Sequence, residues 1–189
     1  MGQSAPPRIR GPQRPDGVLH LSIFPTNIGW FGLIGHGTHL LSVMAGHVSA
    51  AEVRRAARSR FPRAPTAADI AETDWYPQLR RRLETYALGT PDEFRDVDLE
   101  LPATTEFQRK VLNTTRRIGY GKTLTYGQLA EKAGFPRAAR GVGTVMSSNQ
   151  FPIIIPCHRV VAAGGKIGGY SAPLGVDLKS RLLSMEAGQ

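Results

Sequence analysis

The sequence predicts an α+β protein: a small antiparallel sheet with helices, followed by a mostly helical C-terminal domain. Short apolar runs broken by turn residues fill most of the first fifty positions, which is typical of a strand meander. Helical spacing of apolar residues, with capping residues in front, then takes over. An acidic stretch between two prolines, residues 91–102, separates the patterns. We therefore expect a leader at 1–16, an N-terminal domain at 17–100 and a C-terminal domain at 101–189.

Composition limits the class of protein. The chain has 189 residues, is 41% apolar and contains one cysteine. No apolar run approaches the roughly 20 residues that a membrane-spanning helix needs. Met1–Asp16 is rich in Pro, Gly and Arg and lacks the apolar block of a signal peptide, so we interpret it as a flexible leader. A single cysteine without a secretion signal indicates a cytoplasmic protein, nucleoid-associated if it is bacterial.

The net charge of +9 is concentrated in the C-terminal part. Residues 1–100 hold 12 Lys and Arg against 11 Asp and Glu, and residues 101–189 hold 12 against 4. A basic domain attached to a nearly neutral one is typical of a protein that binds a polyanion such as nucleic acid. A generic basic surface is the alternative.

The N-terminal elements begin with three apolar runs. Val18–Phe24, Ile28–Leu33 and His39–Met44 predict a meander of antiparallel strands. A helix over Ser49–Phe61 follows, with Ser49 as N-cap and Glu52 at the third helical position as its capping-box partner. The prolines of residues 62–66 end it.

A second helix is predicted over Asp74–Leu88, where apolar residues recur at helical spacing and Gly89 closes the run. We assign Trp75, Tyr76 and Tyr86 to core packing. Within Pro91–Pro102, three alternating apolar residues resemble one strand: Val97, Leu99 and Leu101.

The C-terminal domain opens with a helix that begins at Thr104 or Thr105 and runs to about Ile118. Gly119–Lys122 forms a turn, and Thr125 caps a short helix over Tyr126–Ala133. Pro136 cannot lie inside a helix, so a second helix begins near Arg137 and runs to Ser147. Helix, glycine-containing turn and helix is the spacing of a helix-turn-helix.

The second of these helices is thin, because most of its side chains are Ala, Gly or Ser. A thin helix that carries Arg140 could press against a nucleic-acid backbone or groove. Tight packing inside the protein also selects Ala and Gly, and the residues alone leave both readings open.

Two glycine motifs are weak. Gly121-Lys122-Thr123 is not a phosphate loop, because that motif needs a glycine where Arg116 stands. Gly164-Gly165 and Gly168-Gly169 fit a tight hairpin or a loop that approaches a ligand closely.

Cys157 carries the strongest chemical signal. Ile153–Ile155, bounded by two prolines, predicts a short buried strand that presents Cys157 on a fixed turn. A lone thiol has neither an internal disulfide partner nor a thiolate-rich metal cage, so its expected role is that of a nucleophile. His158 is next to it in sequence and would act through an irregular turn or a bridging water, because neighbouring extended residues point to opposite faces.

Further candidates for the same site are Asn149, Arg140, Tyr126, Tyr170, Ser171 and Glu186. Glu186 could orient His158 and complete a Cys-His-carboxylate relay. Taken alone, each has an ordinary structural reading, such as an inert buried Cys or a core Tyr.

These residues resemble a known family. Ile155-Pro156-Cys157-His158-Arg159-Val160-Val161 is similar to the active-site signature of the O6-alkylguanine-DNA alkyltransferases, also called methylated-DNA–protein-cysteine methyltransferases. Further similarities are the helix-turn-helix from Thr125 to Gly143, a hinge asparagine at Asn149, Gly168-Gly169-Tyr170-Ser171, and the closing helix Leu182–Glu186. The resemblance covers about residues 104–187, whereas residues 1–100 match only in layout.

The resemblance implies the reaction and its residues. Cys157 would take a methyl or larger alkyl group from O6-alkylguanine, and by the same route from O4-alkylthymine, in a single irreversible turnover. His158, through water and backed by Glu186, would deprotonate the thiol, and Tyr126 would bind the N3 edge of the base. The other implied pocket residues are Met146, Pro152, Val160 and Val161 with their carbonyls, Tyr170 and Ser171.

The resemblance also implies the partner and the fold. The partner would be double-stranded DNA bound from its minor groove, with Arg140 filling the gap left by the flipped base and Thr125, Tyr126, Ala139 and Gly143 facing the duplex. The N-terminal domain would be ribonuclease H-like and the C-terminal domain winged-helix-like. We expect a monomer with no obligate protein partner and no cofactor, and no zinc, since the N-terminal domain has no cysteine.

Other functions remain as alternatives. A non-catalytic protein that only flags alkylated DNA would share the fold but lack the reactive thiol. A helix-turn-helix regulator would read base edges in the major groove, usually as a dimer. A cysteine hydrolase would use the same relay, but it does not explain the basic C-terminal domain.

Overall fold

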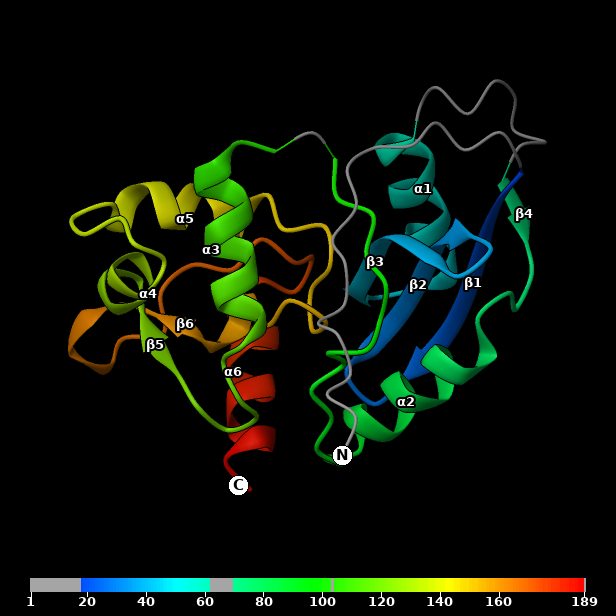
Figure 1. Ribbon diagram of the computed structural model, residues 1–189. Coiled ribbons are helices and arrows are strands. Elements are labelled where there is room, and N and C mark those ends of the chain that lie inside the picture. Colours follow the sequence, from blue (N-terminus) through cyan, green and yellow to red (C-terminus); the bar gives the residue numbers. More distant parts are fainter. Residues whose placement is uncertain (1–17, 62–69, 103, 189) are drawn as a thin grey trace, which may run out of the picture.

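The computed structural model describes residues 18–61, 70–102 and 104–188, which form two halves packed side by side (Figure 1). The N-terminal half holds a four-stranded sheet, and the C-terminal half is mostly helical. The predicted leader and the predicted helix end at 62–66 lie outside the described residues.

The sheet has the order β3-β2-β1-β4. Strands β1 (Leu19–Thr26), β2 (Gly29–His36) and β3 (His39–His47) form the predicted antiparallel meander. Strand β4 (Ile70–Glu72) lies parallel to β1, so the sheet is mixed and the expectation of a purely antiparallel sheet is wrong. Three residues are too few for a recognisable alternation, which is why the sequence did not reveal β4.

Helix α1 (Ala50–Arg60) covers one face of the sheet. Its Val53 and Ala57 are fully buried in a cluster with Leu21, Ile34 and Met44. Ser49 is the N-cap as predicted, since its hydroxyl accepts from the amide of Glu52 at 3.3 Å. The capping box is only half formed, because the Glu52 carboxylate accepts from the amide of Val48 instead of that of Ser49.

Helix α2 (Pro77–Ala87) covers the other face. Its Leu79 and Leu83 share a cluster with Leu33 and Val43, the strand neighbours of residues that face α1, as the two-residue period of a strand requires. The helix begins at Pro77 and not at the predicted Asp74. Proline is favoured in the first helical turn and disfavours helical geometry in the residue before it.

The acidic stretch at 91–102 is extended but is not a strand of the sheet. Leu99 forms a bridge with Leu40 of β3, in which the Leu40 N–H donates to Asp98 O and the Glu100 N–H donates to Leu40 O. The predicted alternation is present, since Val97, Leu99 and Leu101 are all buried.

The C-terminal half contains α3 (Glu106–Arg116), α4 (Tyr126–Lys132), α5 (Ala139–Ser147) and α6 (Gly175–Glu186). Thr105 and Thr125 cap α3 and α4 through reciprocal bonds with Gln108 and Gln128. The predicted helix-turn-helix is α4 and α5, with α5 starting two residues after Arg137, which has a φ of +69° that no right-handed helix allows. A small parallel pair, β5 (Leu124–Thr125) with β6 (Val160–Val161), ties α4 to the segment after Cys157.

The predicted strand over Ile153–Ile155 does not form. These residues make a buried turn in which Ile153 has a φ of +75°, and the Ile155 amide donates to the Phe151 carbonyl at 2.7 Å. β-Branched residues are strained at positive φ, so the surrounding contacts must hold this turn.

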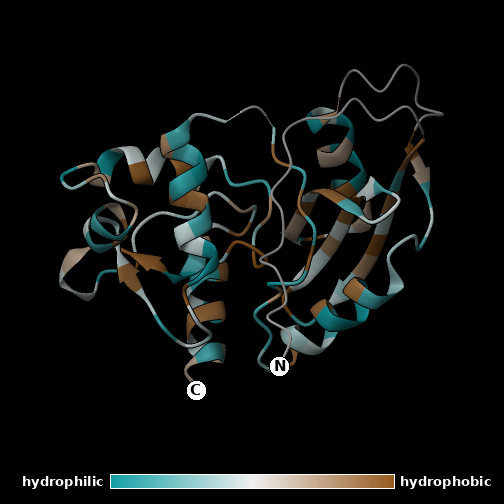
Figure 2. Ribbon diagram, viewed as in Figure 1, coloured by the Kyte–Doolittle hydropathy of each residue, from teal (hydrophilic) through white to brown (hydrophobic). Residues whose placement is uncertain are grey.

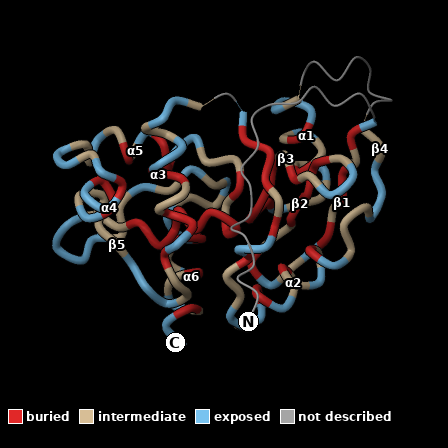
Figure 3. Tube along the Cα trace, viewed as in Figure 1, coloured by how far each residue is buried: buried red, intermediate tan, exposed pale blue. Residues whose placement is uncertain are grey.

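The two halves share one continuous hydrophobic cluster, which runs from Phe24 in β1 to Leu182 in α6. Figure 2 shows apolar residues along the strands and hydrophilic ones on the outer helical surfaces, and Figure 3 shows buried segments where the halves meet. Among the described residues, no helix has the length and apolar character to cross a membrane. The ribonuclease H-like and winged-helix-like descriptions and the domain boundary near residue 100 stay predictions.

Candidate active site

Asn149 holds both the loop before Cys157 and the thiol itself. Its Oδ1 accepts from the Phe151 amide at 3.0 Å, and its Nδ2 donates to the Ile155 carbonyl at 2.8 Å and to Cys157 Sγ at 3.1 Å. These bonds close the turn that carries the strained Ile153. The predicted grouping of Asn149 with Cys157 is therefore present, and Asn149 sets the position of the sulfur.

The edge of the N-terminal sheet supports the same loop. The Val43 amide of β3 donates to the Gln150 carbonyl at 2.8 Å, and the Ser42 hydroxyl donates to that carbonyl at 3.1 Å. Strand β3 is the outer strand of the sheet, so its free edge is satisfied by the active-site loop.

His158 and Glu186 form the predicted pair. Cys157–Arg159 is a single 3₁₀ turn, and it points His158 into the interior, where the side chain is fully buried. His158 Nε2 lies 3.0 Å from Glu186 Oε1, and Nδ1 is buried without a hydrogen-bond partner among the described residues. Burial lowers the pKa of His158, against the raising effect of Glu186, so the ring is neutral at pH 7. A neutral ring that donates through Nε2 has its lone pair on Nδ1, where it can accept a proton.

The Glu186 carboxylate is the centre of a buried network. Arg159 donates to both its oxygens, and Nη2 approaches Oε1 at 2.8 Å. The Tyr86 hydroxyl donates to Oε1, and the Gly121 amide donates to Oε2 at 3.1 Å. Burial would raise the pKa of Glu186, but the bonds from His158 and Arg159 outweigh it and hold that pKa far below its usual range. Glu186 is thus a fixed anion behind His158.

Sequence reasoning missed two members of this network. Tyr86 was assigned to plain core packing, but its hydroxyl reaches across from α2 to Glu186 and lies 3.3 Å from His158 Nε2. Arg159 appears in the sequence only as part of the signature around Cys157, whereas in the structure its side chain binds Glu186 and the Ile118 carbonyl. The available signal for Tyr86 is a tyrosine in an apolar helical stripe, since a buried hydroxyl needs a hydrogen-bond partner.

Lys179 is the third missed residue. Its side chain is fully buried, and Nζ donates to the carbonyls of Val160 at 2.6 Å and Gly169 at 3.2 Å. Burial raises the pKa of Cys157, while the Asn149 hydrogen bond and the charge of Lys179 oppose that rise. The buried charge of Lys179 therefore favours the thiolate, against the larger opposing effect of burial.

We expect Lys179→Met to slow alkyl transfer. Losing a charged interaction of about 1.5–3 kcal/mol would raise the pKa of Cys157 further and slow transfer roughly 10- to 100-fold at neutral pH. Because the thiolate is the reactive form, the rate rises with pH, and the variant's rate–pH profile should move to higher pH. Single-turnover rates measured from pH 6 to 10 check this.

The control is Lys122→Met, the same change at an exposed lysine. Its profile should overlay that of the parent chain. A Lys179→Met profile that is lowered uniformly, with no displacement along the pH axis, would contradict the electrostatic role and indicate structural damage.

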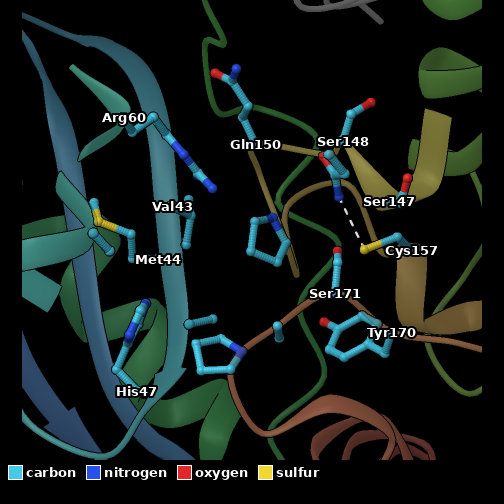
Figure 4. A pocket seen from close by; sticks show the side chains of 16 residues that line it. Val43, Met44, His47, Arg60, Ser147, Ser148, Gln150, Cys157, Tyr170 and Ser171 are labelled. Carbon is cyan, nitrogen blue, oxygen red and sulfur yellow. Dashed lines mark hydrogen bonds between the residues drawn. The ribbon is translucent and has the colours of Figure 1, made fainter. Parts of the chain in front are cut away.

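Two cavities meet at the sulfur. One, of about 250 Å³, lies against the helix-turn-helix and is lined by Tyr126, Gly143, Met146, Ser147, Cys157, Gly169, Tyr170 and Ser171. The other, of about 280 Å³, shares Ser147, Cys157, Tyr170 and Ser171 with it and extends past Pro152 to β3 and α1 (Figure 4). The predicted pocket residues Met146, Tyr170 and Ser171 line the first and Pro152 the second. Val160 lines neither, and its carbonyl binds Lys179.

The glycine-rich loop packs closely on Tyr126. A Cβ at Gly168, where φ is +75°, would lie 3.3 Å from the Tyr126 ring. Burial and the nearby Cys157 raise the pKa of Tyr126, so its hydroxyl stays protonated and can donate. Gly168 thus allows the loop to pack against Tyr126, which lines the first cavity. The predicted close approach of this loop to a ligand stays a prediction.

The predicted DNA-facing residues lie around α4 and α5. Arg140 is exposed, Ala139 and Thr125 are half-buried, and a Cβ at Gly143 would meet no atom within 4 Å. The small residues therefore leave part of α5 open instead of serving only to pack it. Within residues 18–61, 70–102 and 104–188, no group of three or more His, Cys, Asp or Glu is arranged to hold a metal ion.

Comparison with known proteins places this constellation in a family. Residues 106–188 match the family model described as 6-O-methylguanine DNA methyltransferase, DNA binding domain. The chain is 41% identical over 118 residues to a methylated-DNA–protein-cysteine methyltransferase of Methanosarcina acetivorans, covering 62% of this chain and 72% of that one. It is 34% identical over 169 residues to the protein of the same name from Mycobacterium tuberculosis, covering 89% and 93%.

Solved structures agree. The O6-methylguanine methyltransferase of Mycobacterium tuberculosis superimposes with a TM-score of 0.71 at 29% identity, over 90% of this chain and 94% of that one. The structure of the same organism's protein in complex with DNA superimposes with a TM-score of 0.70 at 30% identity, over 89% of this chain and 93% of that one. The protein of Pyrococcus kodakaraensis gives 0.65 at 26% identity, over 89% and 99%. With the signature around Cys157, these similarities over most of both chains show that this chain belongs to the methylated-DNA–protein-cysteine methyltransferase family.

Proposed function

We propose that this protein repairs DNA by moving an alkyl group from O6 of guanine to Cys157, once per molecule. One observation carries the proposal: the thiol lines a cavity on the helix-turn-helix side and is backed by the buried His158–Glu186 pair. The family relatives, one of them solved with DNA, support DNA as the substrate.

Proton transfer precedes or accompanies the attack. His158 accepts the thiol proton at Nδ1 through a bridging water, while its Nε2–H stays bonded to Glu186. The anion of Glu186 stabilises the imidazolium that forms, as the carboxylate of a catalytic triad does. Lys179 and the Asn149 amide stabilise the thiolate.

The displacement itself exchanges two bonds. Sγ forms a bond to the alkyl carbon, the bond from that carbon to O6 breaks, and the electron pair leaves with the base. Tyr126 donates a hydrogen bond to the base, which stabilises the leaving anion. The proton that His158 took from the thiol is then passed to the base, so the products are a thioether on Cys157 and guanine. A thioether has no nucleophilic sulfur left, which is why each molecule acts once.

We propose that the flipped base enters from the minor groove side, past α5. Extrusion of a nucleotide costs a few kcal/mol, and Arg140 would offset part of this by filling the gap in the duplex. Ala139 and Gly143 keep that surface thin enough for a groove about 6 Å wide. Because one chain carries every residue invoked, we expect a monomer to be active.

Intact mass after reaction with duplex DNA tests the proposal. A duplex containing one O6-methylguanine should add a single methyl group to the chain, mapped to Cys157, and excess DNA should add no more. Repair of more than one O6-methylguanine per protein molecule, with the methyl group released into solution, would exclude the proposal, and so would an unchanged protein mass. Binding of alkylated DNA without transfer would instead favour the non-catalytic alternative.

Arg140→Ala should slow repair more than it weakens binding. Loss of the side chain that fills the gap is expected to reduce the single-turnover rate about tenfold, on the scale of the flipping cost. The affinity for undamaged duplex should fall only by about as much as it would on removal of any one cation that contacts a phosphate. Rates with O6-methylguanine DNA and affinities from fluorescence anisotropy measure the two separately.

Arg109→Ala supplies the comparison, because Arg109 is an exposed arginine on α3 in the same half. Its repair rate at saturating DNA should match that of the parent chain. Equal repair rates for Arg140→Ala and Arg109→Ala would remove Arg140 from the proposed flipping step.

A further inference from the structure

The second cavity at Cys157 is larger than methyl transfer requires. It has a volume of about 280 Å³, near the lower end of the roughly 300–1,000 Å³ typical of small-molecule sites. It is lined by Cys157, as the first cavity is, but also by Pro152 and by residues of β3 and α1, so it lies between the active-site loop and the N-terminal half. In an in-line displacement the sulfur, the alkyl carbon and O6 are collinear, so further carbons of the alkyl group must project sideways. With guanine in the first cavity, this second cavity is the adjoining space that can receive them.

The far wall of this cavity is basic. Figure 4 shows Arg60, from the last turn of α1, and His47, from the end of β3, on the side of the pocket opposite Cys157. Among the described residues that line it there is no Asp or Glu, and Arg60 is the one permanent charge. Burial lowers the pKa of His47, and the charges of Arg60 and Arg55 add to this against Glu52, so His47 is a neutral hydrogen-bonding group at pH 7.

Arg60 retains unused hydrogen-bonding capacity. Its Nη1 donates to the Ser42 hydroxyl at 2.7 Å, and no carboxylate of the described chain lies within 4.0 Å of its guanidinium. Part of the side chain is open to solvent, and desolvation of the rest lowers the pKa of Arg60 without neutralising it. A guanidinium offers five N–H donors in a planar fork that matches a carboxylate.

The middle of the cavity is mixed. Val43, Met44 and Ala45 of β3 and Pro152 and Pro173 of the facing loops supply apolar surface between the sulfur and Arg60. Methylene groups would lie there at no cost in hydrogen bonds, and an anionic end would reach Arg60. The position of Arg60 therefore favours an alkyl tail that ends in an anionic group.

We propose that this cavity accepts O6-alkyl groups that end in a carboxylate several methylenes from the base, with Arg60 binding the carboxylate. The inference rests on the proposed alkyl transfer and names a substrate class for it. The reaction is the same displacement: the bond from Sγ to the first methylene forms, the bond from that methylene to O6 breaks, and the proton ends on guanine. The carboxyalkyl group remains on Cys157, with its charge beside Arg60.

The test compares matched tails in one duplex. O6-(3-carboxypropyl)guanine and O6-(5-carboxypentyl)guanine are each paired with the carboxamide of the same length, and O6-methylguanine is the reference. In the parent chain at least one carboxylate should react faster than its amide. Arg60→Gln should slow that carboxylate on the order of tenfold, the scale of one charge-assisted hydrogen bond, and leave the amide and methyl substrates within about twofold. Arg60→Lys should restore part of the loss.

Two further variants separate recognition from scaffolding. Arg58→Gln changes an exposed arginine of the same helix that does not line the cavity, and it should leave all rates unchanged. Ser42→Ala removes the hydroxyl that bonds Arg60 and the Gln150 carbonyl, and any effect should be equal for every substrate.

Equal rates for carboxylate and amide at both lengths in the parent chain would overturn this inference. An Arg60→Gln chain that is slow on every substrate would also overturn it, because Arg60 would then contribute to DNA binding or to the stability of the fold and not to binding of the carboxylate. If the parent chain fails to take even the methyl group, the proposed function itself fails, so the two failures are distinguishable. Intact mass confirms in each case that the whole tail has moved to Cys157.

Discussion

Cys157→Ser should reduce alkyl transfer to background while the protein still folds and binds DNA. A serine hydroxyl is far less acidic than a thiol and a much weaker nucleophile, so Lys179 and His158 cannot activate it to a useful extent. Transfer of a labelled methyl group from O6-methylguanine duplex, followed over hours, measures the loss.

Folding and binding of this variant are expected to persist. The change is nearly isosteric, and Asn149 Nδ2 can donate to the serine oxygen as it does to Sγ, so we expect a stability loss of about 1 kcal/mol. Thermal unfolding and anisotropy with alkylated duplex check these two points. Label retained on the serine variant, on any residue, would show that Cys157 is not the acceptor.

Glu186→Gln should damage both stability and rate. The Glu186 carboxylate lies 2.8 Å from the buried Arg159 guanidinium, whereas the half-buried Glu93 carboxylate is 4.0 Å away. Removing one partner of a buried ion pair costs about 3–5 kcal/mol. His158 also loses the anion that fixes its tautomer and stabilises its protonated form. Loss of an oriented base typically costs about 10²–10⁴-fold in rate, which we expect here for single-turnover transfer.

The pH dependence of stability gives a second readout for Glu186. Its pKa is depressed in the folded chain, so its stabilisation is fully present above the unfolded value of about 4.3 and is lost as the pH falls toward the folded value. The parent chain should therefore lose stability between about pH 5 and the acid limit. Glu186→Gln should be less stable at pH 7 and show a flatter decline below pH 5. Urea unfolding at several pH values measures both.

Glu100→Gln is the matched control, since Glu100 is also a buried carboxylate and lies 3.4 Å from His36 in the N-terminal half. It should lose stability but keep the parent rate at saturating DNA. A Glu186→Gln chain that repairs at the parent rate would remove the carboxylate from the proposed relay, whatever happens to its stability.

Local pattern was a good guide to most elements. The three strands of the meander, the caps Ser49, Thr105 and Thr125, and the helix-turn-helix all follow from periodicity and capping residues within a few positions of the chain. Errors arose where local and tertiary forces disagreed. Ile153–Ile155 has strand composition, but the bonds of Asn149 force Ile153 to positive φ and close a turn. Strand β4 is stabilised by its pairing with β1, and three residues carry no pattern of their own.

Residues close together in the chain are enough to predict Cys157 as the nucleophile, His158 as its neighbour and the basic helix-turn-helix half, because a short motif and capped, periodic helices are local patterns. Glu186, 28 residues from His158, is predicted from the relay chemistry and the family resemblance. Which distant groups surround the Cys157 sulfur depends instead on how the two halves pack. Tyr86, Arg159 and Lys179 join the site, and Arg60 faces it across a cavity, because the two halves bury one common core and bring α2, β3 and α1 against the loop of Cys157. Contacts between residues far apart in the chain depend on packing, and no local pattern records them.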